Sequence, residues 1–200
     1  AALLSVLQMP SGSIWQIAAY FIAVFAFYRS AIFVHELTHL ERGTFKLFRW
    51  MWNLTCGIPL MIPSFTYDGV HYEHHNPGIY GTSKDGEYLP FATQRPLMMV
   101  GYVLLSLLLP LLLVLRFLIL TPLSYLSPAI RKIVWERASS LTINFAYQRA
   151  QDTVRNDQNW RLQEFATFLF AFAVIASVLL GLLPYQLLVV WYALAAMIFT

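Results

Sequence analysis

Long apolar stretches without charged side chains alternate with shorter polar segments along this chain. Residues 1–28 contain no Asp, Glu, Lys or Arg, and the apolar run over 14–34 is interrupted only by Arg29. About 20 residues of α-helix, at a rise of about 1.5 Å per residue, cross the hydrocarbon core of a bilayer. The pattern therefore predicts a transmembrane helix over residues 14–34.

A second charge-free stretch covers residues 165–200. Gly181 and Pro184 lie near its middle, and these residue types favour a turn over a continuous helix. We therefore expect a helical hairpin whose two membrane-spanning arms cover 165–182 and 186–200.

The placement of residues 96–120 depends on the charges around them. This segment contains Pro110 and only one charged residue, Arg116. Basic residues flank it on both sides: Arg42, Lys46, Arg49, Lys84 and Arg95 before it, and Arg131, Lys132, Arg137, Arg149, Arg155 and Arg161 after it. Because cytoplasmic loops of membrane proteins are enriched in Lys and Arg, both groups belong on the cytoplasmic side. We therefore expect 96–120 to be re-entrant, reversing near Pro110, or interfacial, with Arg116 reaching the lipid headgroups.

The composition also indicates a membrane protein. Hydrophobic side chains make up 58% of the chain and charged ones 12%, whereas soluble domains carry about 25% charged residues. The net charge of +3 is dispersed and does not favour nucleic-acid binding, and the single cysteine, Cys56, excludes an internal disulfide. We expect one all-α, polytopic integral membrane domain over residues 1–200. Because Thr200 falls within an apolar run, we also expect this domain to be a fragment of a longer protein.

The chain has five histidines, and all of them lie between residues 35 and 75 in two groups. His35 and His39 follow the first predicted span, and on a helix residues four apart share a face. His71, His74 and His75 fall within an arc of about 100° on a second, short helix. We expect Asp68 to cap that helix and Pro77 to end it.

Imidazole is a common ligand of Fe, Zn, Cu and Ni, and the clustering of all five rings at ligand spacing indicates metal binding. A catalytic metal must keep a coordination position open, so five imidazoles fit two metal ions better than one. The predicted ligands are His35, His39, His71, His74 and His75.

Two enzyme classes are compatible with the first histidine group. Residues 35–39 read His-Glu-Leu-Thr-His, the HExxH pattern in which two histidines bind zinc and Glu36 activates water in a protease. A zinc protease has no use for the three histidines of residues 71–75, and no acidic third ligand occurs over 165–200. An intramembrane zinc protease remains a distant alternative to an oxygenase.

The two groups resemble the histidine boxes of the integral-membrane fatty acid desaturase family. HELTH over 35–39 matches the first box of that family, and HYEHH over 71–75 matches the second. The segments 64–71 and 80–90 are similar to a bacterial branch of it. No histidine follows His75, so the third box of the family is missing, and we expect it beyond the end of this fragment.

The resemblance implies two iron ions, O2 as oxidant and a fatty acyl lipid of the bilayer as substrate. It also implies electrons from a carrier such as ferredoxin or cytochrome b5 with its reductase, and a site facing the cytoplasm, in a bacterial inner membrane. Desaturation of the acyl chain is the expected reaction, and hydroxylation on the same scaffold is the alternative.

Carboxylates near neutral imidazole ligands orient the rings and supply negative charge. We expect Glu36, Glu73 and Asp68 to act in this way, with Asp85 and Glu87 as further candidates. The polar stretch 136–159 is expected to form a cytoplasmic cap over the site.

Overall fold

The computed structural model describes residues 2–41, 43–82, 84–88, 96–144, 146–150 and 158–199, and this part of the chain is helical, without strands. Three helical segments have the length and apolarity needed to cross a bilayer: residues 14–39, 99–126 and 158–179. The prediction of an all-α, polytopic membrane protein is therefore confirmed. The basic residues Arg42, Arg95 and Arg155 lie outside the described residues.

The first span, α2 (Ile14–His39), is longer than its apolar stretch and includes the first histidine box. The hydroxyl of Ser13 caps its start by accepting a hydrogen bond from the Gln16 amide at 3.1 Å. The helix ends where Leu40 takes an extended conformation. His35 and His39 therefore stand on the last turns of a continuous membrane helix. The short helix α1 (Ala2–Gln8) packs against α2 and against the C-terminal helix α9 (Gln186–Phe199).

The second long segment consists of α5 (Pro96–Leu115), the π-helix η3 (Arg116–Leu120) and α6 (Thr121–Leu126). Pro110 lies inside α5, so the chain does not reverse there as one of the two expected arrangements required. Proline removes one backbone hydrogen bond of a helix. One turn earlier, the Leu107 carbonyl accepts a hydrogen bond from the Tyr192 hydroxyl at 2.7 Å, which ties α5 to α9 near this position. The position of the segment relative to the bilayer stays a prediction.

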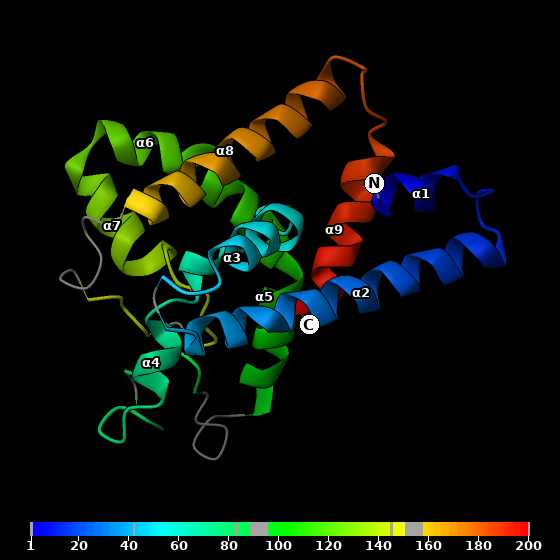
Figure 1. The fold of residues 1–200 in the computed structure, drawn as a ribbon. Coiled ribbons are helices and arrows are strands. Elements are labelled where there is room, and N and C mark those ends of the chain that lie inside the picture. Colours follow the sequence, from blue (N-terminus) through cyan, green and yellow to red (C-terminus); the bar gives the residue numbers. More distant parts are fainter. Residues whose placement is uncertain are drawn as a thin grey trace.

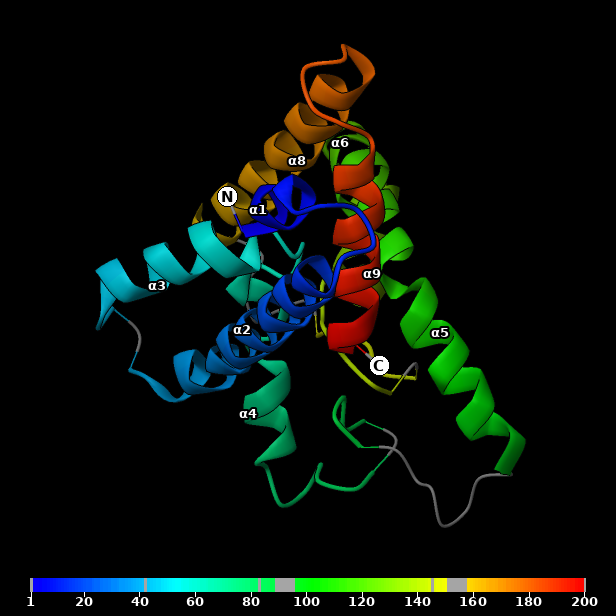
Figure 2. The same cartoon turned by 90° about the vertical axis from the view of Figure 1, so that its right-hand side faces the viewer.

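The C-terminal part consists of α8 (Gln158–Leu179) and α9 (Gln186–Phe199), joined by a turn at Gly181 with φ +72°. Figures 1 and 2 show α9 lying between α2 and α5, and contacts with both helices agree with the two views. Leu194, Ala195 and Ala196 are buried in α9, and the small side chains of the two alanines allow neighbouring helices to approach closely.

The segment between the histidine boxes packs into the helical core. It contains α3 (Lys46–Trp52), the π-helix η1 (Asn53–Gly57) and the 3-10 helix η2 (Ser64–Thr66). The indole nitrogen of Trp52 donates a hydrogen bond to the Ser30 carbonyl at 2.6 Å, and that of Trp191 donates to the Pro59 carbonyl at 2.7 Å. These contacts bind the segment to α2 on one side and to α9 on the other.

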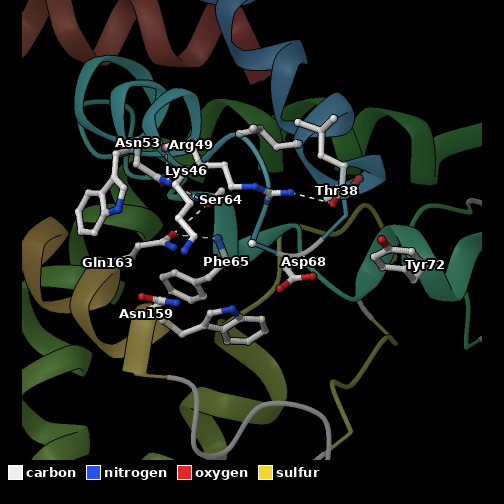
Figure 3. A pocket seen from close by; sticks show the side chains of 15 residues that line it. Thr38, Lys46, Arg49, Asn53, Ser64, Phe65, Asp68, Tyr72, Asn159 and Gln163 are labelled. Atoms are coloured by element: carbon white, nitrogen blue, oxygen red, sulfur yellow. Dashed lines mark hydrogen bonds between the residues drawn. The ribbon is translucent and has the colours of Figure 1, made fainter.

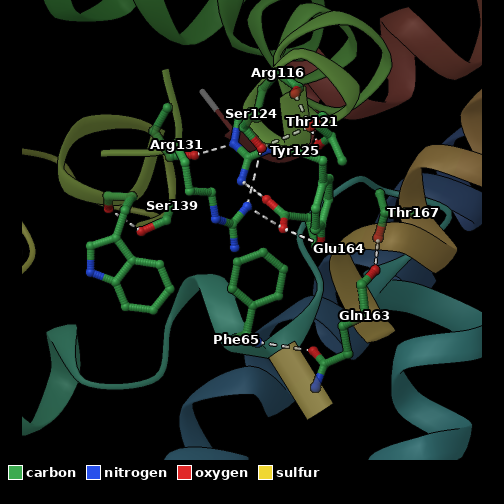
Figure 4. Close-up of polar contacts among 12 residues, drawn as sticks. Phe65, Arg116, Thr121, Ser124, Tyr125, Arg131, Ser139, Gln163, Glu164 and Thr167 are labelled. Carbon is green, nitrogen blue, oxygen red and sulfur yellow. Dashed lines mark hydrogen bonds and ion pairs between the residues drawn. The ribbon is translucent and has the colours of Figure 1, made fainter. Parts of the chain in front are cut away.

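Arg116 is buried instead of reaching the lipid headgroups as expected (Figure 4). Its guanidinium donates to the Glu164 carboxylate of α8 at 2.5 Å, and Arg131 of α7 (Pro128–Ala138) donates to the same carboxylate at 2.6 Å. Tyr125 contributes a hydroxyl at 3.1 Å. The buried carboxylate joins α6, α7 and α8 to η3, and it gives Arg116 a partner within the protein that the sequence pattern did not reveal.

Candidate metal centre

Four of the five histidines converge where α2 ends and α4 (Val70–His74) begins. One ring nitrogen from each of His35, His39, His71 and His75 lies within 4.8 Å of the others. The ring centroids of His35 and His71 are 4.3 Å apart, and those of His71 and His75 are 4.5 Å apart. Two short motifs that are separated by more than thirty positions therefore form one cluster, and these residues are the largest group of potential metal ligands among the described residues.

His71 lies at the centre of the cluster and is almost fully buried. Its Nε2 is 2.9 Å from Nε2 of His39 and 3.0 Å from Nε2 of His75. Two imidazole nitrogens that bind one ion at about 2.1 Å and at right angles to each other lie about 3.0 Å apart. The spacing of these nitrogens therefore suits two neighbouring ligands of a single metal ion.

Glu87 sets the orientation of the His71 ring. Its Oε1 is 3.0 Å from Nδ1 of His71. A carboxylate accepts the Nδ1 proton, and Nε2 is then left with a lone pair that points into the cluster. Burial lowers the pKa of His71, although Glu87 acts in the opposite direction, and the neutral form that binds metal is favoured. The donor set therefore fits a metal ion.

His74 stands at the edge of this cluster. Its ring centroid is 5.7 Å from that of His75, and its Nδ1 is 3.0 Å from both oxygens of Asp85. Asp85 is fully buried and also accepts hydrogen bonds from the backbone N–H groups of Gly81 and Glu87 at 2.9 Å. Burial raises the pKa of Asp85, but these donors outweigh it and lower the pKa overall. The ionised Asp85 holds His74 with its Nε2 free of this pair.

The structure places the three carboxylates expected beside the ligands in different surroundings. Glu36 lies 3.1 Å from Nδ1 of His35, but its side chain is 62% exposed. Glu73 lies near Tyr147, and burial together with this carboxylate raises the pKa of the Tyr147 hydroxyl. The position before α4 is taken by Gly69, with φ +88° and no side-chain cap, so the prediction that Asp68 caps this helix is wrong. The carboxylates that contact the buried ring of His71 and the half-buried ring of His74 are Glu87 and Asp85, which the sequence presented only as further candidates.

A cavity of about 380 Å³ lies beside the cluster, between the end of α2, α3, η2 and the start of α8 (Figure 3). Thr38 and Tyr72, the sequence neighbours of His39 and His71, line it. Its other polar lining residues come from separate elements: Lys46, Arg49, Asn53, Ser64, Asp68, Asn159 and Gln163. Both polar and apolar side chains line the cavity, which lies where the membrane helix α2 ends.

Comparison with known proteins identifies the family. A profile described as fatty acid desaturase matches residues 13–200. The chain belongs to the fatty acid desaturase family. The ceramide hydroxylase of Caulobacter vibrioides (strain NA1000 / CB15N) is 39% identical over 178 residues, which make up 89% of this chain and 50% of that protein. This member of the fatty acid desaturase family thus spans about half the length of the curated relative it matches. No solved structure matches it significantly.

The chain thus combines the membrane-spanning helices of a fatty acid desaturase family member with a histidine cluster able to bind metal. The match to a hydroxylase fits the alternative reaction better than the desaturation that was expected first. Neither the family nor the joining of both histidine groups into one cluster supports the zinc-protease alternative.

Proposed function

We propose that this chain forms part of an O2-dependent lipid hydroxylase whose iron ligands are His35, His39, His71, His74 and His75. The observation that carries the proposal is the convergence of three imidazoles on that of His71, with Glu87 behind the His71 ring. His74, held by Asp85 at the edge of the cluster, completes the ligand set for a second iron. With two ions, five imidazoles leave coordination positions open for O2 and substrate.

Iron bound here would supply O2 activation, which no amino-acid side chain provides. The contribution of the protein is to present ligands in the right protonation state. Glu87 and Asp85 hold the Nδ1 protons of His71 and His74, so that the Nε2 atom of each ring carries its lone pair. His71 and its neighbour Val70 in α4 are both buried, which keeps water from the protein side of the His71 ring.

Hydroxylation replaces a C–H bond by C–OH, with one oxygen atom of O2 entering the product and the other leaving as water. The second oxygen atom requires two electrons, which we assign to a carrier such as ferredoxin or cytochrome b5 with its reductase. We place the site on the cytoplasmic face of a bacterial inner membrane. The similarity to a ceramide hydroxylase supports a fatty acyl lipid, with a ceramide as the first candidate substrate.

The test uses the full-length protein in liposomes with ceramide or phospholipid, an electron-donor system and isotopically labelled O2. Mass spectrometry of the lipid should show one labelled oxygen atom in the acyl or base chain. A His71→Ala variant should lose both iron and product, whereas Lys132→Gln on exposed α7 should retain both. Loss of two hydrogens without label would overturn hydroxylation in favour of desaturation. Iron-loaded protein that releases peptides but leaves lipids unchanged would overturn the oxygenase.

A further inference from the structure

The stretch formed by residues 139–144 and 146–150, here named the brace, contacts the segments on both sides of the second histidine box although it lies more than sixty positions away in sequence. It lies between α7 and α8 in the sequence. The Leu141 amide donates to the Thr66 carbonyl at 2.7 Å, and Tyr147 lies near Glu73 of α4, where burial together with this carboxylate raises the pKa of the Tyr147 hydroxyl. The brace thus reaches both the turn before α4 and α4 itself.

Asn144 connects the brace to the loop that carries Asp85 and Glu87. Its side-chain amide donates to the Asp85 carbonyl at 2.8 Å. The backbone N–H groups of Ile143 and Asn144 both donate to the Gly86 carbonyl, at 2.9 and 3.1 Å. The loop is therefore held at two consecutive carbonyls, directly behind the carboxylates that contact His74 and His71.

The contact between brace and loop is too close for any side chain at residue 86. A Cβ atom there would lie 2.8 Å from a methyl carbon of Val70, 3.1 Å from Thr142 and 3.2 Å from the Tyr147 ring. Val70 begins α4, whereas Thr142 and Tyr147 belong to the brace. The loop is thus packed between α4 and the brace, and a shift of the brace would move both carboxylates.

Arg149 holds the other end of the brace. Its guanidinium donates to the Asp68 carbonyl at 2.7 Å and to the Ser139 carbonyl at 3.1 Å, and it is buried. Its charge lies 4.5 Å from the centre of the Trp160 ring, within the range of a cation–π interaction. The turn that leads into α4 is therefore fixed to the brace by a side chain with little freedom to move.

We propose that Asn144 is a positioning residue of the metal centre, acting through Asp85 and Glu87 to fix the rings of His74 and His71. Groups that orient metal ligands from behind change metal affinity by about 10–100-fold when they are altered. The inference rests on the metal centre of the proposed function, and it concerns a residue that the family motifs do not include.

The experiment uses the Asn144→Asp variant of the full-length protein. Aspartate keeps the oxygen that accepts the Ala146 amide at 3.0 Å, but it replaces the donor facing the Asp85 carbonyl with an oxygen. Titration of the metal-free protein with Co²⁺ reports affinity, and the visible absorption bands of Co²⁺ report ligand geometry. We expect affinity to fall about tenfold or more, with altered bands.

Asn53→Asp is the matched control. Asn53 is buried, and its amide donates to the Arg49 carbonyl at 3.0 Å and to the Ser64 hydroxyl at 2.9 Å, so the same substitution removes the same kind of bond at a site outside the Asp85–Glu87 loop. Its Co²⁺ affinity and bands should equal those of the wild type in the folded fraction. If Asn144→Asp does not fold, Asn144→Ser offers a smaller change with the same expected loss of affinity.

A double variant separates positioning from general stability. If Asn144 acts through Asp85, the effects of Asn144→Asp and Asp85→Asn on Co²⁺ affinity will not add, because the second change removes a contact already disturbed. Additive effects, or wild-type affinity and bands in Asn144→Asp, would overturn this inference while leaving the metal centre in place. A wild-type protein that binds no Co²⁺ would overturn both the metal centre and this inference.

Discussion

Replacing Glu164 by glutamine tests the buried charge network that connects four helical elements. The Glu164 side chain is 3% exposed and accepts from Arg116, Arg131 and Tyr125. Glutamine has nearly the same shape, but one of its two acceptor oxygens becomes an NH2 group, which faces a guanidinium as a second donor. At least one ion-paired hydrogen bond is lost, and the buried charge of Arg116 loses its counter-ion.

The expected cost follows from the two losses. A hydrogen bond to a charged group contributes about 1.5–3 kcal/mol. Breaking a buried ion pair by removing one partner costs about 3–5 kcal/mol, because the remaining charge stays buried. Glutamine keeps one acceptor oxygen, so we expect the low end of this range, about 3 kcal/mol of unfolding free energy.

The free energy of unfolding can be measured in detergent by the reaction of Cys56 with a thiol probe, read by mass spectrometry of its peptide. Cys56 is 2% exposed, so it reacts when the protein opens. The control is Lys132→Gln on the exposed face of α7, which removes the ion pair between Lys132 and Glu136 with an N–O distance of 4.0 Å. This change should lower the free energy of unfolding by less than about 0.5 kcal/mol. A loss below about 1 kcal/mol for Glu164→Gln would refute the view that this carboxylate holds the helices together.

Three further predictions test other parts of the structure. Gly86→Ala should lower the free energy of unfolding by about 1–3 kcal/mol and weaken Co²⁺ binding, because the new Cβ would lie 2.8 Å from a methyl carbon of Val70. Thermal unfolding and Co²⁺ titration measure both effects, and wild-type values would contradict the prediction. Burial raises the pKa of Cys56 to about 12, so in the folded protein at pH 8 this residue is a buried, protonated thiol that reacts poorly with maleimide. Labelling should therefore be as slow as unfolding, and rapid labelling of the folded protein would contradict the burial of Cys56. Glu36→Gln should change Co²⁺ affinity less than about threefold, since solvent screens this exposed carboxylate; a loss as large as that of Asp85→Asn would place Glu36 in the centre.

Local patterns predicted those parts of the protein that depend on local geometry. Apolar stretches without charged residues located the membrane helices. The spacing of His35 to His39 and of His71 to His75 placed each group on one face, because residues three or four apart lie on the same side of an α-helix. The structure then brings four of these five rings together. Metal occupancy itself stays a prediction.

The parts that escaped prediction depend on contacts distant in sequence. Arg116 is buried because Glu164, on another helix, is available as a partner, and no local pattern connects the two. Asn144 bonds to Asp85 although 59 positions, including α5 and α6, separate the two residues in sequence. Asp68 is a good capping residue by type, but Gly69 takes the capping position with a positive φ. The glycine between Asp85 and Glu87 is the one local signal that could have drawn attention to this loop.

The continuity of α2 links the chemistry to the thickness of the membrane. The 26 residues of α2 extend about 39 Å, longer than a hydrocarbon core of about 30 Å, and His35 and His39 occupy the end that projects. A bilayer of shorter or longer lipids changes the tilt of such a helix. Tilting α2 would shift His39 against His71, whose position is set by α4, so lipid chain length would alter the geometry between the two halves of the ligand set.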